Sequence, residues 1–284
     1  GDHRELHSFP PRRSSDLLLD NTSVVIFIFI VISILACLTI PEAIHSSDAI
    51  DQQLVGSWKG IFTHKNVAGA VAAVSVFLFL NGYGFKSQKI NKIFAFVSFI
   101  FLIMTASKTS IILVVVIVLF SRPRFLSYAI RNIHYVFAVC LMFSPLIYLG
   151  LVYTQALINN PESFTGRSSI WQILFQIIYD NPYIGAGFQS LYHVGPYSKL
   201  TEYAGDWVQF VAHGHNGYID LTAQIGVLGV LLFIVVIIKP IFVYLKMSLE
   251  KKTTECVCIF SIFSFFLAHN FTESSFLDTT RVGW

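Results

Sequence analysis

The chain has 284 residues, of which 55% are hydrophobic and only 12% are charged, and its net charge is +3. Ordinary soluble domains carry about 25% charged residues, and here the apolar residues come in long blocks rather than at amphipathic spacing. This composition excludes an ordinary soluble domain and indicates a polytopic membrane protein. The four cysteines all fall inside apolar blocks, which excludes a disulfide framework.

The first 17 residues are polar and basic, unlike everything that follows them. Because Arg13-Ser14-Ser15-Asp16 resembles a translated sequencing adapter, we expect residues 1–17 to be a non-native segment and leave them out of the fold prediction.

Seven apolar segments are candidates for membrane spans. A bilayer core about 30 Å thick requires roughly 20 mostly apolar residues per helix. The segments cover about 23–40, 67–85, 93–106, 109–121, 133–152, 224–245 and 256–268. The sequence therefore predicts an all-α polytopic membrane protein with about seven transmembrane helices and one large extracytoplasmic loop.

Lysines and arginines concentrate in alternate links between these segments, at 86–92, 121–132 and 246–255. Basic links mark the cytoplasmic side, which puts 41–66, the turn at 107–109 and the long polar loop outside. The expected organisation is transmembrane helices one to five in 18–152, a periplasmic catalytic loop in 153–222, and helices six and seven with an outer tail in 223–284. No charge lies in the middle of a span, which weighs against a transporter or channel.

Within the outer loop, residues 165–179 predict an amphipathic helix, capped by Thr165 or Ser168 and ended by Asn181-Pro182. Its apolar positions are typical of a helix lying on a membrane surface. They are Ile170, Trp171, Ile173, Leu174, Ile177 and Ile178, with Ser169, Gln172 and Gln176 on the other face.

Arg167 stands at the start of that helix, where free backbone N–H groups and the helix dipole favour an anion. A guanidinium there adds a charge-assisted grip on phosphate oxygens. Contact with ordinary lipid headgroups would explain the same arginine.

The rest of the loop offers two further motifs. Gly185-Ala186-Gly187 permits a tight turn or a close backbone approach and lacks the spacing of a dinucleotide site. His213-Gly214-His215-Asn216 precedes the sixth span, and a neutral imidazole there is available as a base; a turn that caps the helix is the alternative. A metal site is not expected, because the histidines are two residues apart and no further ligand is evident. The aromatic residues between these motifs fit sugar stacking and an interfacial belt equally.

Together these elements resemble the O-antigen ligase and polymerase family of bacterial cell envelopes, including its exopolysaccharide-production branch. The resemblance covers about residues 55–275 and rests on the order of its motifs. They are Gly60-Ile61-Phe62-Thr63-His64-Lys65-Asn66, Ser107-Lys108-Thr109-Ser110, Gly166-Arg167-Ser168-Ser169-Ile170-Trp171 with Asn181-Pro182-Tyr183-Ile184-Gly185-Ala186-Gly187, His215-Asn216-Gly217-Tyr218 leading to Gly226-Val227-Leu228-Gly229, and His269-Asn270-Phe271-Thr272-Glu273-Ser274.

The resemblance implies a GT-C type membrane glycosyltransferase that uses an undecaprenyl-pyrophosphate-linked glycan as donor at the outer face of the bacterial inner membrane. Its implied partners are a glycan or lipid A core acceptor, membrane lipids and a chain-length regulator, with no nucleic acid and no cofactor. Relatives usually have ten or more spans, so we expect this chain to be a fragment that lacks N-terminal helices.

The implied chemistry displaces pyrophosphate from the sugar in a single inverting step without a metal. Arg167 and Lys108 are the expected pyrophosphate contacts, and His215 is the expected general base. Family members often have arginine where this chain has Lys108, and lysine keeps the charge but loses the bidentate fork. The expected substrate-binding residues are His64, Lys65, Asn66, Trp171, Gln172 and Asn216.

Three functions stay open at this point. A polymerase joins glycan repeat units to one another, and the likeness to the exopolysaccharide branch favours it. A ligase transfers the finished chain to lipid A core by the same chemistry. A transporter or flippase would bind lipid-linked glycan without turning it over.

Overall fold

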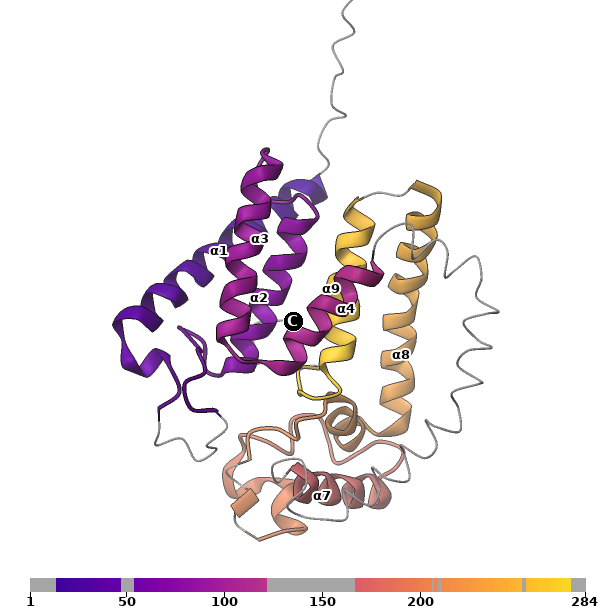
Figure 1. Ribbon diagram of the computed structural model, residues 1–284. Coiled ribbons are helices and arrows are strands. Elements are labelled where there is room, and N and C mark those ends of the chain that lie inside the picture. Colours follow the sequence, from indigo (N-terminus) through magenta and orange to yellow (C-terminus); the bar gives the residue numbers. More distant parts are fainter. Residues whose placement is uncertain are drawn as a thin grey trace, which may run out of the picture. The chain divides into compact units, whose positions relative to one another are not determined.

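The computed structural model describes residues 14–46, 54–121, 167–205, 207–208, 211–251 and 254–276 (Figure 1). The predicted fifth span at 133–152 and the first part of the predicted outer loop lie outside these residues. So do Thr165 and most of the basic link at 121–132. Within the described part, all regular elements are helices, apart from an isolated antiparallel bridge between Ile44 and Trp58. The predicted all-α class is confirmed for these residues.

Six of the described helices correspond to predicted apolar segments and one to the helix predicted in the outer loop, although the first begins nine residues before the expected segment and the one after the loop seven residues before it. The helices are α1 (Ser14–Thr39), α2 (Lys65–Leu80), α3 (Gln88–Met104), α4 (Lys108–Phe120), α7 (Arg167–Asp180), α8 (Gly217–Lys251) and α9 (Thr254–His269), with short 3₁₀ turns between some of them. The chain divides into two compact units. Residues 1–118 with 253–262 form the first unit, and residues 119–252 with 263–284 form the second.

Two of these helices are long and apolar enough to cross a membrane. They are Asp16–Thr39, with 24 residues, and Gly217–Ile237, with 21 residues; the mean hydropathy of the 18-residue window within each is 2.8 and 2.3. Only 28% and 22% of these windows are buried, whereas the core helix of a soluble protein would be covered on most sides. Three further apolar helices, Lys65–Leu80, Lys108–Phe120 and Val257–His269, are shorter than a full span. The structure thus supports two spans, and the larger number stays a prediction.

In the first unit, α1, α2 and α3 pack side by side (Figure 1). Phe27 of α1 stacks on Phe94 of α3 at 4.1 Å between ring centroids. A buried hydrogen bond of 2.8 Å joins Ser75 of α2 to Ser98 of α3. A serine pair of this kind satisfies two polar groups that would otherwise be stranded between apolar helices.

The beginnings of α2 and α4 also meet in the first unit. Gly69, one turn into α2, has no room for a side chain, since a Cβ there would lie 2.6 Å from Cβ of Ser107. Ser107 in turn donates to Ser110 at 3.0 Å. A small residue is therefore required where the two helices cross.

In the second unit, α7 packs against α8 around a core that is shared with the loop between them. The buried members are Trp171, Leu174, Ile177, Leu191, Leu200, Val208 and Ala223. The helix predicted at 165–179 is confirmed from Arg167 to its stop before Asn181-Pro182. Ser168 was one of its two predicted caps, and this is wrong, because Ser168 lies inside the helix. The proposed place of the helix on a membrane surface needs correction, because the face at Trp171, Leu174 and Ile177 is covered by protein.

Helix α8 is interrupted at Gly226, whose φ of 65° and ψ of −179° are not helical. The backbone of 182–187 lies against the break: Val227 N donates to Pro182 O at 2.8 Å and Ala186 N donates to Ala223 O at 2.8 Å. A Cβ on Gly226 would lie 2.3 Å from the carbonyl carbon of Tyr183. The predicted close backbone approach at Gly185-Ala186-Gly187 is therefore confirmed, and its counterpart is the glycine in α8.

Candidate functional site

The candidate site lies in the second unit, where three segments meet: the start of α7, the loop 213–216 before α8, and the tail 270–276 after α9. Arg167 is the first residue of α7, and its Nη1 donates to Thr272 O in the tail at 3.1 Å. Its Nη2 lies 3.8 Å from Oε1 of Glu273, with about a quarter of the arginine side chain exposed. The guanidinium predicted to bind phosphate therefore also anchors the tail to α7.

The loop 213–216 is held at Gly214 by hydrogen bonds on both sides of the residue. Nε1 of Trp171 donates to Gly214 O at 2.6 Å, and Gly214 N donates to Oδ2 of Asp220 at 3.0 Å. A Cβ on Gly214 would lie 2.3 Å from Oδ1 of Asp220. Position 214 must therefore be glycine for the Asp220 carboxylate to lie this close to the backbone. Trp171, expected from sequence to bind substrate, is buried and serves here to position the histidine loop.

Asp220 is the buried acceptor that joins this loop to its surroundings. Besides Gly214 N, it accepts hydrogen bonds from the hydroxyls of Tyr192 and Ser274. Several donors are what a buried carboxylate needs, because a charge removed from water is costly unless it is hydrogen-bonded. Burial, followed by the charge of Asp220, raises the pKa of Tyr192 well above its ordinary value, so this phenol stays a donor.

His215 has a left-handed backbone, with φ of 57°. Residues other than glycine adopt this region infrequently and at a cost of roughly 1–2 kcal/mol. The hydrogen bonds on its neighbours hold the conformation, since Asn216 N donates to Ser274 Oγ at 3.1 Å and Gly214 is held as described. Strain that the surrounding structure maintains is characteristic of functional positions.

Asn216 caps α8 and also binds the tail. Its Oδ1 accepts from the N–H groups of Tyr218 and Ile219 at 3.0 and 3.1 Å, and its Nδ2 donates to Phe271 O at 3.1 Å. Gly217 N donates to Glu273 O at 3.0 Å. The capping role left open by the sequence is thus realised by Asn216, directly beside the candidate base.

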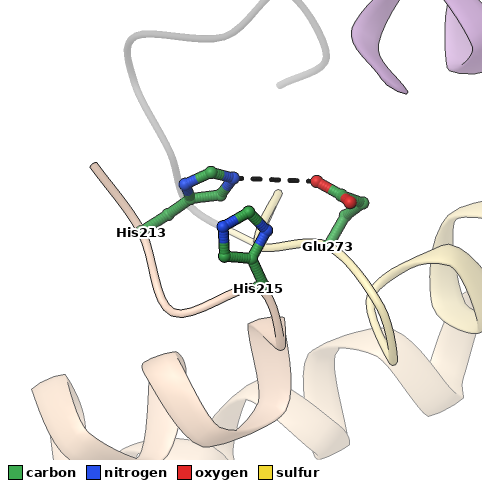
Figure 2. A group of neighbouring side chains, drawn as sticks. All are labelled: His213, His215 and Glu273. Atoms are coloured by element: carbon green, nitrogen blue, oxygen red, sulfur yellow. Dashed lines mark ion pairs between the residues drawn. The ribbon is translucent and has the colours of Figure 1, made fainter. Parts of the chain in front are cut away.

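These contacts bring His213, His215 and Glu273 together (Figure 2). One nitrogen from each histidine and one carboxylate oxygen all lie within 4.8 Å of one another. The two imidazole rings are 4.0 Å apart between centroids, and Nε2 of His213 lies 3.7 Å from Oε2 of Glu273. Arg167 approaches the other oxygen of the same carboxylate.

Glu273 is 3% exposed and surrounded by cationic or basic groups. Burial alone would raise the pKa of its carboxyl. The hydrogen bond from His213 and the charges of His215, His213 and Arg167 outweigh burial and lower the pKa to about 2. The carboxylate is therefore ionised at any physiological pH and supplies a fixed negative charge beside both histidines.

The other predicted site residues lie elsewhere. Gln172 is exposed on α7, in the same unit as the cluster. His64, Lys65, Asn66 and Lys108 belong to the first unit, at the beginnings of α2 and α4. His64 caps α2 by accepting from Asn66 N at its Nδ1, at 3.2 Å, and Lys65 Nζ donates to Ser57 Oγ at 3.4 Å. Lys108 is exposed at the first position of α4.

Glu273 and Asp220 are site residues that sequence reasoning did not assign. A signal for Glu273 existed: it is a carboxylate directly after an apolar segment, in a tail already noted as part of a motif. Its partners could not be found from spacing, since Arg167 and Thr272 are 105 residues apart in the chain. Glu273 also supplies the third ligand whose absence argued against a metal site at the two histidines.

Comparison with known proteins gives a match for half of the chain. The sequence model of the O-antigen ligase family matches residues 93–234, which include Lys108, Arg167 and His215 but not Glu273. The exopolysaccharide production protein ExoQ of Rhizobium meliloti is 27% identical over 131 residues, which are 44% of this chain and 29% of that protein. A Rickettsia conorii protein with the provisional name of polysaccharide ligase is 26% identical over 108 residues, 37% of this chain and 25% of that protein. The chain thus spans less than a third of the length of either relative.

Proposed function

The chain belongs to the O-antigen ligase family, and on this premise we propose that it is a membrane glycosyltransferase that acts on lipid-linked glycan. The donor is an undecaprenyl-pyrophosphate-linked glycan at the outer face of the inner membrane, and the acceptor is a sugar hydroxyl. The observation that carries the proposal is the meeting of Arg167 and His215, from two separate elements, at the buried carboxylate of Glu273.

The proposed reaction is a single displacement at the anomeric carbon. The acceptor oxygen forms a bond to that carbon while the bond to the pyrophosphate oxygen breaks, so the configuration is inverted. The acceptor proton passes to a neutral ring nitrogen of His215, a contribution of roughly 10²–10⁴-fold for a positioned base. The negative charge leaves on the lipid pyrophosphate, and no metal is required for these steps.

Charge on the leaving pyrophosphate is balanced by Arg167 in this proposal. Arg167 is partly exposed at the start of α7, where the helix dipole favours an anion. A guanidinium has five N–H donors, so the hydrogen bond to Thr272 leaves others for phosphate oxygens. Glu273 fixes the direction of this arginine and keeps positive charge near His215 from accumulating.

Between the two acceptors, a growing glycan is favoured over lipid A core. The similarity to a protein named for exopolysaccharide production supports a polymerase, which joins repeat units to each other. The name of the family and of the second relative supports a ligase, the alternative with the same chemistry. A chain-length regulator is a further proposed partner if the product is a polymer.

Removal of the proposed base or of the pyrophosphate contact tests this function. Full-length protein with His215→Ala or Arg167→Ala, expressed in a deletion strain, is expected to lose glycan transfer by at least about 100-fold. The readout is a glycan gel, with membrane levels checked by immunoblot. Polymerase loss leaves single-repeat product, whereas ligase loss leaves core without attached chain.

His193→Ala is the matched control, because His193 is an exposed histidine of the same loop with a positive φ and no place in the cluster. It is expected to retain activity. Wild-type glycan in a strain that carries either His215→Ala or Arg167→Ala would contradict the assignment.

A further inference from the structure

The cluster of His213, His215 and Glu273 has the composition of a transition-metal site (Figure 2). Two imidazoles and one carboxylate are a ligand set that zinc uses when three protein ligands leave a fourth position open. Imidazole nitrogen also discriminates against Mg²⁺ and Ca²⁺, which prefer oxygen ligands.

The separations suit a zinc ion with little rearrangement. Tetrahedral ligands at about 2.0–2.1 Å from the metal lie about 3.3 Å from each other. Nε2 of His213 and Oε2 of Glu273 are 3.7 Å apart, and all three ligand atoms lie within 4.8 Å. Small rotations of the side chains would bring them onto one ion.

The ligands are held in place by partners outside the cluster. Arg167 engages Oε1 of Glu273 and leaves Oε2 facing His213, an arrangement typical of ligating carboxylates, which are usually fixed by a further contact. Trp171 and Asp220 hold Gly214 between the two histidines. The positive charge of Arg167 opposes a second cation, so we expect an ion that exchanges with chelators rather than a permanent structural metal.

We propose that His213, His215 and Glu273 form a Zn²⁺ site, and that the bound ion inhibits glycan transfer by occupying a ring nitrogen of His215. Coordination uses the lone pair of a neutral imidazole. A coordinated His215 cannot accept the proton of the acceptor hydroxyl. This inhibitory half rests on the proposed function, whereas the binding half does not.

Direct metal binding is the decisive test. The purified full chain in detergent, stripped with EDTA, is titrated with ZnCl₂ against a chromogenic zinc indicator, and CoCl₂ is followed by its visible absorption. One Zn²⁺ per chain is expected, with intense Co²⁺ bands from a site of low coordination number and no competition from MgCl₂. His213→Ala and Glu273→Gln should each weaken binding by more than about tenfold, since even the loss of an outer partner costs a metal site 10–100-fold.

His193→Ala serves again as the control and should bind zinc as the wild type does. Two different ligand variants are needed because Glu273 is buried, and a fold defect in one would not affect the other. Unchanged zinc affinity in both variants, or no zinc binding by the wild type, would overturn the proposal.

Activity gives the second readout and separates the two proposals. Transfer by the wild type should fall with ZnCl₂ at the concentrations that fill the site and recover with EDTA. The same inhibition, taken relative to each variant's own zinc-free rate, should be lost in His213→Ala. Zinc binding without any transferase activity would refute the proposed function alone, and transfer that zinc does not affect would refute the inhibition.

Discussion

At the scale of single residues, Glu273 determines the electrostatics of the candidate site. It is a buried carboxylate whose ionised form is maintained by His213, His215 and Arg167 rather than by water. Removing one partner of such a group is costly because the remaining charge stays buried and unpaired. The stability of the tail is therefore expected to depend on whether the Glu273 carboxylate is protonated.

The pKa of Glu273 predicts how stability depends on pH. Its folded value of about 2 lies below the ordinary value of 4.5, so its stabilisation is complete above about pH 4.5 and is lost as pH falls toward 2. A shift of this size corresponds to about 3 kcal/mol. Glu273→Gln should lower the unfolding midpoint of the detergent-solubilised protein at pH 7, and the difference from wild type should narrow below pH 4.5.

The matched control for this measurement is Glu202→Gln, since Glu202 is an exposed carboxylate paired with Lys199 at 2.5 Å. Surface pairs contribute about 0–1 kcal/mol, so this variant should follow the wild type at every pH. A constant difference between Glu273→Gln and wild type from pH 3 to 7 would refute the electrostatic account.

At the scale of elements, the break in α8 at Gly226 provides the contact between this helix and the segment that follows α7. The turn at 182–187 uses the backbone groups that the break leaves without helical partners, as when Gly187 N donates to Gln224 O at 2.9 Å. Gly185 and Gly226 permit this contact because a Cβ on either would collide with the opposing backbone. The segment after α7 is thereby fixed to the helix that begins at the histidine loop.

Gly226→Ala should therefore destabilise the second unit strongly. The backbone conformation of Gly226 is almost restricted to glycine, and the added methyl would overlap Tyr183. The expected loss is at least about 3 kcal/mol, measured as a lower midpoint in thermal unfolding with reduced protein in the membrane.

Gly195→Ala provides the comparison, because Gly195 has φ of 58° but open space where its Cβ would stand. It should cost only the roughly 1–2 kcal/mol of the left-handed conformation. Equal effects of the two substitutions would show that the contact with Tyr183 is unimportant.

At the scale of the whole molecule, the described helices suit a membrane. The long exposed faces of α1 and α8 carry large apolar side chains that would be unfavourable in water. The basic residues Lys86, Lys89 and Lys92 lie at the junction of α2 and α3, at the opposite end of these helices from Lys65 and Lys108. The positive-inside rule predicts that the junction faces the cytoplasm.

Thiol labelling of intact cells tests this orientation. In a background without the four native cysteines, Lys199→Cys in the outer loop should react with a membrane-impermeant maleimide. Lys86→Cys should react only after permeabilisation. Both positions are exposed, so accessibility within the protein does not differ, and the reverse pattern would invert the predicted topology.

Patterns in the sequence were sufficient to predict the helical class, the bounds of α4 and α9 to within two residues, and the family. These predictions rest on signals that are local or follow the order of the chain, so they need no knowledge of tertiary contacts. The signals are the long apolar blocks, the helix-ending Asn181-Pro182 and the order of the motifs. The sequence also singled out Arg167 and His215 as candidates, since each stands at a helix beginning in a polar loop.

The contacts of these two candidates became known only from the three-dimensional structure. Glu273 is far from both along the chain, and a charged contact between distant segments leaves no trace in periodicity or spacing. Trp171 illustrates the same point. Its place in a polar loop led to the prediction that it binds substrate, whereas the structure shows that it is buried and donates to Gly214 O. Long-range packing and hydrogen bonding turned two separate motifs and a tail into one site.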